Sequence, residues 1–87
     1  MDWNGFERCR FELARPLLVV KGGRGVLSCG YLSIDTADQI GEALAVVRGV
    51  SQFDDMLDAK VVAVSEAAGQ LGVESGMSGQ QALERFR

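Results

Sequence analysis

The sequence contains no histidine, and this absence excludes several kinds of catalytic site. Without an imidazole, a single chain cannot form a Ser-His-Asp triad or a Cys-His pair, and it lacks the commonest transition-metal ligand. The two cysteines, Cys9 and Cys29, are far apart in the sequence, and neither belongs to a CxxC motif. A structural zinc site is therefore not expected, nor is a disulfide in a reducing cytoplasm. We expect no metal and no cofactor.

Long apolar runs and a strong excess of charge are also missing. Apolar residues make up 47% of the chain, yet no run approaches the roughly 20 residues that span a membrane. No basic segment followed by an apolar one opens the sequence, so a secretory signal peptide is not expected. Residues 1–34 carry a small excess of basic side chains within a net charge of −3, which is too weak to indicate nucleic-acid binding. We expect a soluble, cytoplasmic protein that binds neither membrane nor nucleic acid.

The length of 87 residues sets the scale of the core. Such a chain is long enough for one domain and too short for two, so residues 1–87 are predicted to form a single domain. A chain of this size buries only about two thirds of the surface that it exposes when unfolded. Because so small a core provides little stability beyond what folding requires, self-association is expected to add stability.

Alternation of apolar and charged residues marks the first predicted strand. Between residues 8 and 13, the side chains of Cys9, Phe11 and Leu13 fall on one face and charged side chains on the other. This period of two is typical of a half-buried strand. We therefore expect Cys9 and Phe11 to face the core.

Two further strands follow within the first third of the chain. Pro16 interrupts the alternation, because proline lacks the amide donor of a strand ladder. Residues 17–20 form the second predicted strand, the glycine-containing residues 21–24 a tight turn, and residues 25–32 the third strand. The N-terminal β region, about residues 6–32, is thus predicted to be an antiparallel meander.

The middle of the chain alternates short helices with a buried strand. Asp35 is the predicted N-cap of a helix that ends near Gly41. Residues 43–47 are entirely apolar, which indicates a strand covered on both faces. Ser51, with Asp54 three residues later, predicts the start of another helical turn.

Residues 59–71 fit two patterns. Val61, Val62 and Val64 favour a strand by their β-branched side chains. The spacing of Val61, Val64 and Ala68, by contrast, is that of one helix face. We predict a helix over residues 59–71 that ends at Gly72.

A capping box begins the last predicted helix. Ser78 and Gln81 have the spacing in which each side chain binds the other residue's backbone N–H. Ala82, Leu83 and Phe86 then form a small apolar stripe. The sequence as a whole predicts an α+β fold, with the N-terminal antiparallel meander, one further buried strand and three to four short helices, in the order β-β-β-α-β-α-α-α.

Two segments could carry chemistry. Cys29, followed by Gly30 at the end of a strand, could serve as a nucleophile, although a cysteine in this position also serves as a small apolar residue. The segment from Gly76 to Gly79 precedes a helix whose first N–H groups could bind an anion. The same donors could instead be satisfied by Ser78 in the capping box. No lysine follows these glycines, so the segment is not a nucleotide-binding P-loop.

Three other features have simpler explanations. Residues 21–25 are basic and glycine-rich like a phosphate loop, but a hairpin turn accounts for them. Asp54, Asp55 and Asp58 could bind a hard cation, but acidic residues are favoured at helix N-termini in any case. Trp3 suits either a subunit contact or a frayed N-terminal arm.

Several short segments in a fixed order resemble a known family. They are Cys29-Gly30 after a strand, Gly49-Val50 at the end of the buried strand, Asp55-Met56-Leu57-Asp58-Ala59, Ala67-Ala68 with Leu71-Gly72, and Gly76-Met77-Ser78-Gly79 running into Ala82-Leu83. Over nearly the whole length, the chain is similar to the YunC-like family (DUF1805), small bacterial and archaeal proteins of unknown function. The resemblance implies an α+β fold whose N-terminal β-sheet region serves in tetramerisation, and it assigns no catalytic residue.

Two functional hypotheses follow. The first is a homo-oligomeric structural or interaction protein, a tetramer assembled through the N-terminal β region. The alternative is a small-ligand-binding protein or enzyme in which Cys29 and Gly30 meet the anion-binding segment of Gly76, Ser78 and Gly79 in a cleft.

Overall fold

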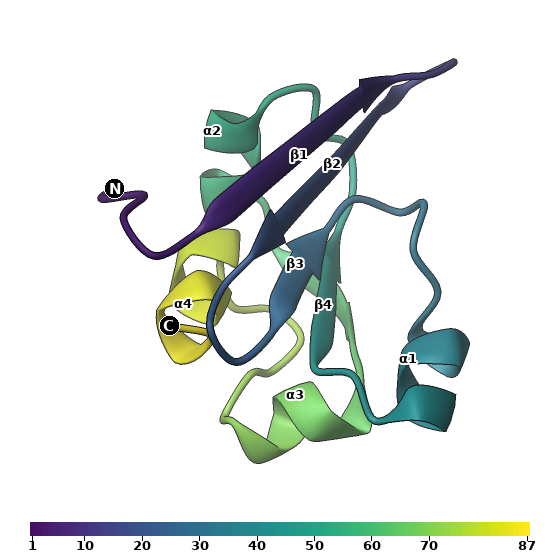
Figure 1. The fold of residues 1–87 in the computed structure, drawn as a ribbon, viewed down its shortest axis with the longest axis vertical. Helices are drawn as coiled ribbons and strands as arrows, with labels where there is room; N and C mark the ends of the chain where they lie inside the picture. The colour runs from purple at the N-terminus through teal and green to yellow at the C-terminus, as the bar shows by residue number, and fades with distance from the viewer.

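The computed structural model describes residues 1–87 and contains one mixed sheet of five strands, with four helices (Figure 1). In chain order the elements are β1 (Glu7–Glu12), β2 (Pro16–Lys21), β3 (Val26–Ser28), α1 (Ile34–Ile40), β4 (Leu44–Val47), α2 (Phe53–Asp58), β5 (Val61–Val64), α3 (Glu66–Gln70) and α4 (Gly79–Arg85). The α+β class and the predicted order of elements are confirmed, with β5 as one further strand. None of the helices is long and apolar enough to cross a membrane.

The strands lie side by side in their order along the chain. β1, β2 and β3 form the predicted antiparallel meander. β3 and β4 pair in parallel, with Ser28 opposite Val46, and α1 supplies the crossover that parallel neighbours require. Because these two strands run in the same direction, the loops that follow them leave the sheet at the same end.

Residues 59–71 do not form the continuous helix that the sequence predicted. Val61–Val64 is a strand, β5, which pairs antiparallel with β4, and only Glu66–Gln70 is helical. The register shifts between Val46 and Val47, so Val61 lies opposite Val47 while Val64 lies opposite Ala45. This irregularity places Val61 and Val64 on the same face of the sheet, although a regular strand would separate them. Their spacing of three residues therefore imitated a helix.

Two helix starts differ from the prediction by one or two residues. The N-cap of α1 is Ser33, not Asp35, because the Ser33 hydroxyl accepts a hydrogen bond from the N–H of Thr36. The N-cap of α2 is Gln52, not Ser51, and its N–H donates to the carboxylate of Asp55. The predicted end of α1 is confirmed, since Gly41 has a left-handed φ of 77°.

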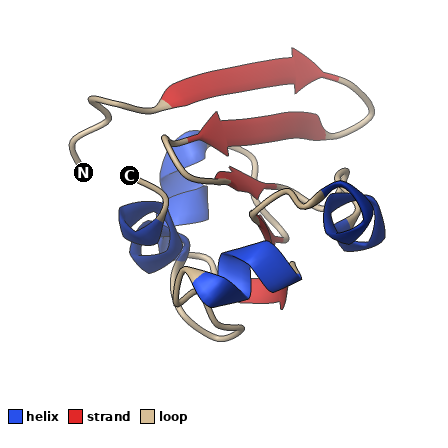
Figure 2. Cartoon of the chain, turned by 60° about the horizontal axis from the view of Figure 1, so that its bottom comes forward, coloured by secondary structure: helices blue, strands red, loops and turns tan.

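The two faces of the sheet carry unequal layers of helix. On one face, side chains of all the inner strands pack against α2, α3 and α4 in a cluster that includes Leu18, Leu27 and Phe86. On the other face, α1 alone packs against the sheet, through Ala37 against Leu44 and Val46. α1 lies away from α2 and α4 (Figures 1 and 2), and it meets the start of α3, where the N–H of Glu66 donates to the carboxylate of Asp38 at 2.8 Å.

The first strand is exposed along its whole length, which corrects the prediction that Cys9 and Phe11 face the core. Cys9 lies opposite Val19 and Phe11 opposite Leu17, whereas the buried Leu18 lies opposite Arg10. Since opposite residues of neighbouring strands share a face, Cys9 and Phe11 project from the side that the larger core does not occupy. Phe11 is 59% exposed.

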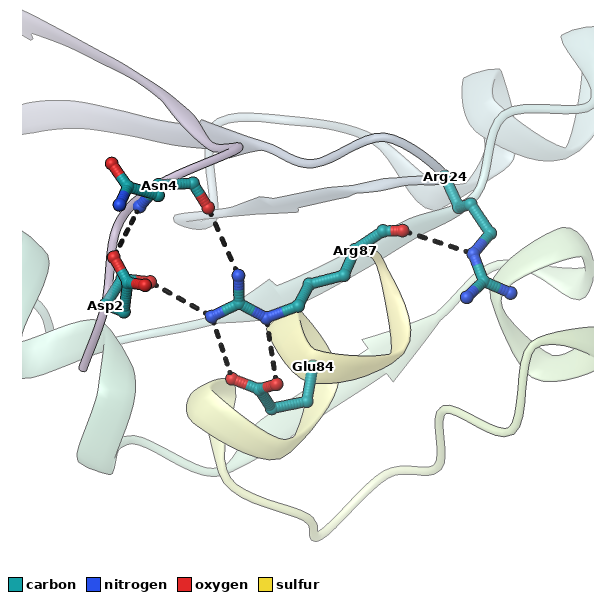
Figure 3. Close-up of polar contacts among 5 residues, drawn as sticks. All are labelled: Asp2, Asn4, Arg24, Glu84 and Arg87. Atoms are coloured by element: carbon teal, nitrogen blue, oxygen red, sulfur yellow. Dashed lines mark hydrogen bonds and ion pairs between the residues drawn. The ribbon is translucent and has the colours of Figure 1, made fainter.

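The capping box and apolar stripe of α4 are confirmed. Ser78 and Gln81 exchange hydrogen bonds through their side chains, and Ala82, Leu83 and Phe86 are fully buried. The helix is followed by Arg87, whose guanidinium donates to the carbonyl oxygens of Asp2 and Asn4 and pairs with Glu84 (Figure 3). The two ends of the chain are therefore joined.

The N-terminal arm that contains Trp3 packs onto the chain itself. The Trp3 ring meets Phe6 and Phe53 edge to face, at centroid distances of 6.4 and 6.3 Å. The guanidinium of Arg8 lies 4.9 Å from the centre of the Trp3 ring. These contacts give Trp3 a role within the fold.

Candidate functional site

Cys29 directly follows β3 and forms hydrogen bonds to Leu18 of β2. Its N–H donates to the carbonyl of Leu18 at 3.0 Å, and its Sγ accepts from the N–H of Leu18 at 3.4 Å. The residue is only 6% exposed and belongs to the larger core cluster. Cys29 therefore has the packing role that one interpretation of the sequence gave it.

The same cysteine lines a pocket at the surface of the molecule. The pocket has a volume of about 490 Å³, within the range of about 300–1,000 Å³ found for small-molecule sites. Its walls come from the turn between β1 and β2, the loop after β3 and the loop after β4. The lining residues are Arg15, Pro16, Cys29, Gly30, Tyr31, Arg48, Gly49 and Val50.

The topology of the sheet explains why these loops meet. β3 and β4 are parallel neighbours, so Gly30 and Gly49 leave the sheet at the same end, where ligands bind in open sheets with parallel strands. β2 runs antiparallel to β3, and the first residues of β2 extend beyond the last residue of β3 at this end of the sheet. This extension brings Arg15 to the pocket.

The charge of the pocket is positive. Arg15 and Arg48 are the only ionised side chains of the lining, and neither forms a salt bridge in the structure. The phenol oxygen of Tyr31 accepts a weak hydrogen bond from the N–H of Arg15 at 3.4 Å. The lining contains no carboxylate or lysine, so no side chain there is suited to take a proton from Cys29 at neutral pH.

The structure does not bring the segment from Gly76 to Gly79 into this pocket, whose lining includes none of its residues. The N–H of Gly76 donates to Val61 and that of Gly79 to Ala59, both at 2.8 Å. Ser78 is used in the capping box. Donors that the anion-binding hypothesis needed are thus occupied within the chain. Cys29 and Gly30 remain together, and Gly76, Ser78 and Gly79 form a separate structural unit.

Several of the remaining basic and acidic candidates have structural partners. In the turn of residues 21–25, Gly22 donates to Gly25, and Arg24 donates to the carbonyl of Phe86. The carboxylate of Asp55 accepts from the N–H groups of Ser51 and Gln52, as a helix cap does. No group of three or more potential ligand side chains is placed to hold a metal ion.

Sequence reasoning missed Arg15 and Arg48 as site residues. Arg48 directly precedes the Gly49-Val50 end of the buried strand, and Arg15 directly precedes Pro16. The available signal was the position of Arg48 directly after an apolar strand, because such positions line sites when the neighbouring strand is parallel. The parallel pairing itself could not be deduced from single residues.

The fold and the pocket define a small α+β protein with one basic hollow at the ends of two parallel strands and no assembled catalytic group. The chain belongs to the family described as a domain of unknown function (DUF1805), whose model matches residues 28–86. It is similar to the uncharacterized protein YunC of Bacillus subtilis (strain 168), with 33% identity over 70 residues, 76% of this chain and 69% of YunC.

A solved structure shares the fold. The crystal structure of a protein of unknown function from Thermoplasma acidophilum, TA1206, superposes with a TM-score of 0.81 at 29% sequence identity. The match covers 94% of this chain and 93% of the other. The predicted resemblance to the YunC-like family is therefore confirmed.

Proposed function

We propose that this chain is a homo-oligomeric structural or interaction protein, a tetramer assembled through the N-terminal β region of residues 6–32. The observation that carries the proposal is one face of β1 and β2, against which no helix packs. α1 packs over β4 and its neighbours, whereas the same face of β1 and β2 has no helix against it. Apolar side chains lie on this uncovered face: the exposed Cys9 and Phe11 and the half-buried Val19.

Apolar side chains are exposed in this region although the total surface of the chain is ordinary. The accessible surface of the chain is 5002 Å², close to the roughly 5,000 Å² expected for a folded monomer of its mass. Large apolar side chains are nevertheless exposed in and next to β1, with Phe11 at 59% and Leu13 at 53%. Apolar side chains gathered on one face are typical of a surface that a partner covers.

The outer edge of β1 supplies a second surface. β1 is the first strand of the sheet, so one of its edges has no neighbour, and its unpaired N–H and C=O groups can pair with another strand. Pairing of two such edges extends the sheet across a two-fold axis, and packing of two uncovered faces uses a different axis. Two distinct two-fold contacts are what a symmetric tetramer requires.

Light scattering on the purified chain tests this proposal. We expect a mass near four times the 9.3 kDa of one chain. Phe11→Glu places a charge on the uncovered face and should reduce the mass to that of a dimer or monomer. Ile40→Glu is the matched control, because Ile40 is 70% exposed on α1, outside the N-terminal β region. A monomer mass for the unmodified chain at micromolar concentration would refute the proposal.

A second candidate function is a small-ligand-binding protein or enzyme that uses the pocket at Cys29. The observation that favours it is a 490 Å³ hollow with a thiol in its wall. The Gly76–Gly79 segment has no part in this version, since it lies outside the lining. Iodoacetamide labelling of folded protein, followed by mass spectrometry, tests it. Labelling of Cys29 within minutes supports an accessible nucleophile, and protection until the protein unfolds opposes one.

A further inference from the structure

The pocket at Cys29 combines two unpaired positive charges with no negative charge. Two other arginines of the chain pair with carboxylates, Arg87 with Glu84 and Arg10 with Glu12. Arg15 and Arg48 have no carboxylate partner, although they come from different elements and line the same hollow. Two like charges at one pocket repel each other, and attraction to an anion between them would offset this repulsion.

The side chain of Arg48 lies beside the neighbouring loop. Its Cγ, Cζ and Nε atoms lie 3.8, 3.9 and 4.0 Å from the point that a Cβ atom of Gly30 would occupy. The side chain therefore lies beside Gly30, in the loop after β3, although its own Cα belongs to the loop after β4. The forked donors of this guanidinium can bind a planar or tetrahedral anion.

Backbone groups add further donors. Gly30, Gly49 and Val50 belong to the loops that line the pocket. Their N–H groups donate no hydrogen bond to another backbone group. Successive free N–H groups in a loop form an anion-binding concavity. The hydroxyl of Tyr31 accepts from the N–H of Arg15, and its proton is still available for donation.

We propose that this pocket binds a small molecule through an anionic group, a carboxylate or a phosphate, held by Arg15 and Arg48. The inference rests on the second candidate function and names its class of ligand. Both anions offer oxygen acceptors to the forked donors of guanidinium groups. The thiol of Cys29 lies in the wall of the same pocket, so it would contact the bound molecule.

Nuclear magnetic resonance on the full ¹⁵N-labelled chain tests the proposal. Inorganic phosphate and acetate are titrated separately, with sodium chloride at matched ionic strength as reference. We expect saturable shifts of the amide signals of Gly30, Tyr31, Gly49 and Val50. The two titrations distinguish a phosphate site from a carboxylate site, and saturation by either one supports the proposal. Shifts that rise linearly with both anions would overturn it.

Charge-matched variants establish whether the arginines bind the anion. Arg48→Gln and, separately, Arg15→Gln should weaken binding about tenfold or more. Arg85→Gln removes the same charge from the end of α4, outside the pocket, and should leave binding unchanged. Both pocket arginines are exposed, so each variant is expected to fold. Equal weakening in Arg85→Gln and Arg48→Gln would show general charge screening and overturn the proposal.

Iodoacetamide, which is uncharged, distinguishes failure of the anion proposal from failure of the second candidate function. If iodoacetamide labels Cys29 rapidly but neither anion saturates, the second candidate function stands and the anion proposal fails. If an anion saturates while Cys29 stays protected, the anion proposal holds and the thiol is not a nucleophile. If neither occurs, both are overturned.

Discussion

Gly79, the first residue of α4, packs closely against α2 and β3. A Cβ atom added at this position would overlap the carbonyl oxygen of Met56 and lie 3.2 Å from Leu27 Cδ2. We expect Gly79→Ala to lower the free energy of unfolding by about 3 kcal/mol, because a backbone carbonyl cannot move aside easily. Urea denaturation measures this change.

Gly69 is the matched control for that substitution. It lies within α3, and a Cβ added there meets no atom within 4 Å. Gly69→Ala should therefore raise the free energy of unfolding by about 0.5–1 kcal/mol, through the greater helix propensity of alanine. Equal effects of the two substitutions would contradict the close approach of Gly79 to Met56.

Glu84 carries a pH-dependent contact at the joined termini (Figure 3). The hydrogen bond from Arg87, with its charge attraction, lowers the pKa of the Glu84 carboxyl below its ordinary value of 4.5. Because the folded pKa is the lower one, this contact stabilises the fold above pH of about 4.5 and is lost as the pH falls through the folded value. Carboxyl ¹³C titration should show this lowered midpoint.

The substitution Arg87→Gln tests the cause of that shift. Without the guanidinium, the pKa of Glu84 should rise toward 4.5, and the signals of Asp2 and Asn4 should move with it, because Arg87 also binds their carbonyl oxygens. The effect on stability should be small, since both side chains are exposed. An unchanged midpoint would contradict the pairing.

Ser65 connects two elements, α3 and β4, and also binds the loop before β4. Its hydroxyl donates to the carbonyl of Glu42 and accepts from the N–H of Leu44, both at 2.8 Å, and it also caps α3. Ser65 is 1% exposed, so Ser65→Ala leaves buried backbone groups without partners. We expect a loss of about 3 kcal/mol in the free energy of unfolding by urea denaturation.

Ser33 provides the comparison for Ser65. Its hydroxyl caps α1 through one hydrogen bond, from the N–H of Thr36 at 3.3 Å, and it is exposed. Ser33→Ala should therefore cost only about 1 kcal/mol. A cost for Ser65→Ala no greater than this would show that the link between α3 and β4 adds nothing beyond the cap.

Most elements could be predicted from local patterns, and the exceptions have physical causes. The apolar residues of β4 and the capping box of α4 gave correct predictions because both depend on residues close together in the sequence. β5 was missed because the irregularity at Val46 and Val47 places Val61 and Val64 on one face. Strand irregularities arise from pairing, and pairing partners are not encoded in the strand alone.

At the scale of the whole molecule, the candidate site could be predicted only in part. Cys29 and Gly30 were identified because a thiol beside a glycine at a strand end is visible in the sequence. Arg15 and Arg48 come together only after β3 and β4 have paired in parallel and the β1–β2 hairpin has extended past them. The same hairpin carries the uncovered apolar face and one wall of the pocket, so assembly and ligand binding would influence each other.

Cys9 offers a test of the proposed assembly that also locates the interface. The thiol is exposed in the single chain and lies on the uncovered face of β1, opposite Val19. In the tetramer another copy would cover it, so iodoacetamide should label Cys9 slowly at high protein concentration and faster on dilution, as mass action separates the subunits. Phe11→Glu should give fast labelling at every concentration, whereas Ile40→Glu should behave like the unmodified chain. Fast labelling of Cys9 in a sample that light scattering shows to be tetrameric would place the interface on another surface.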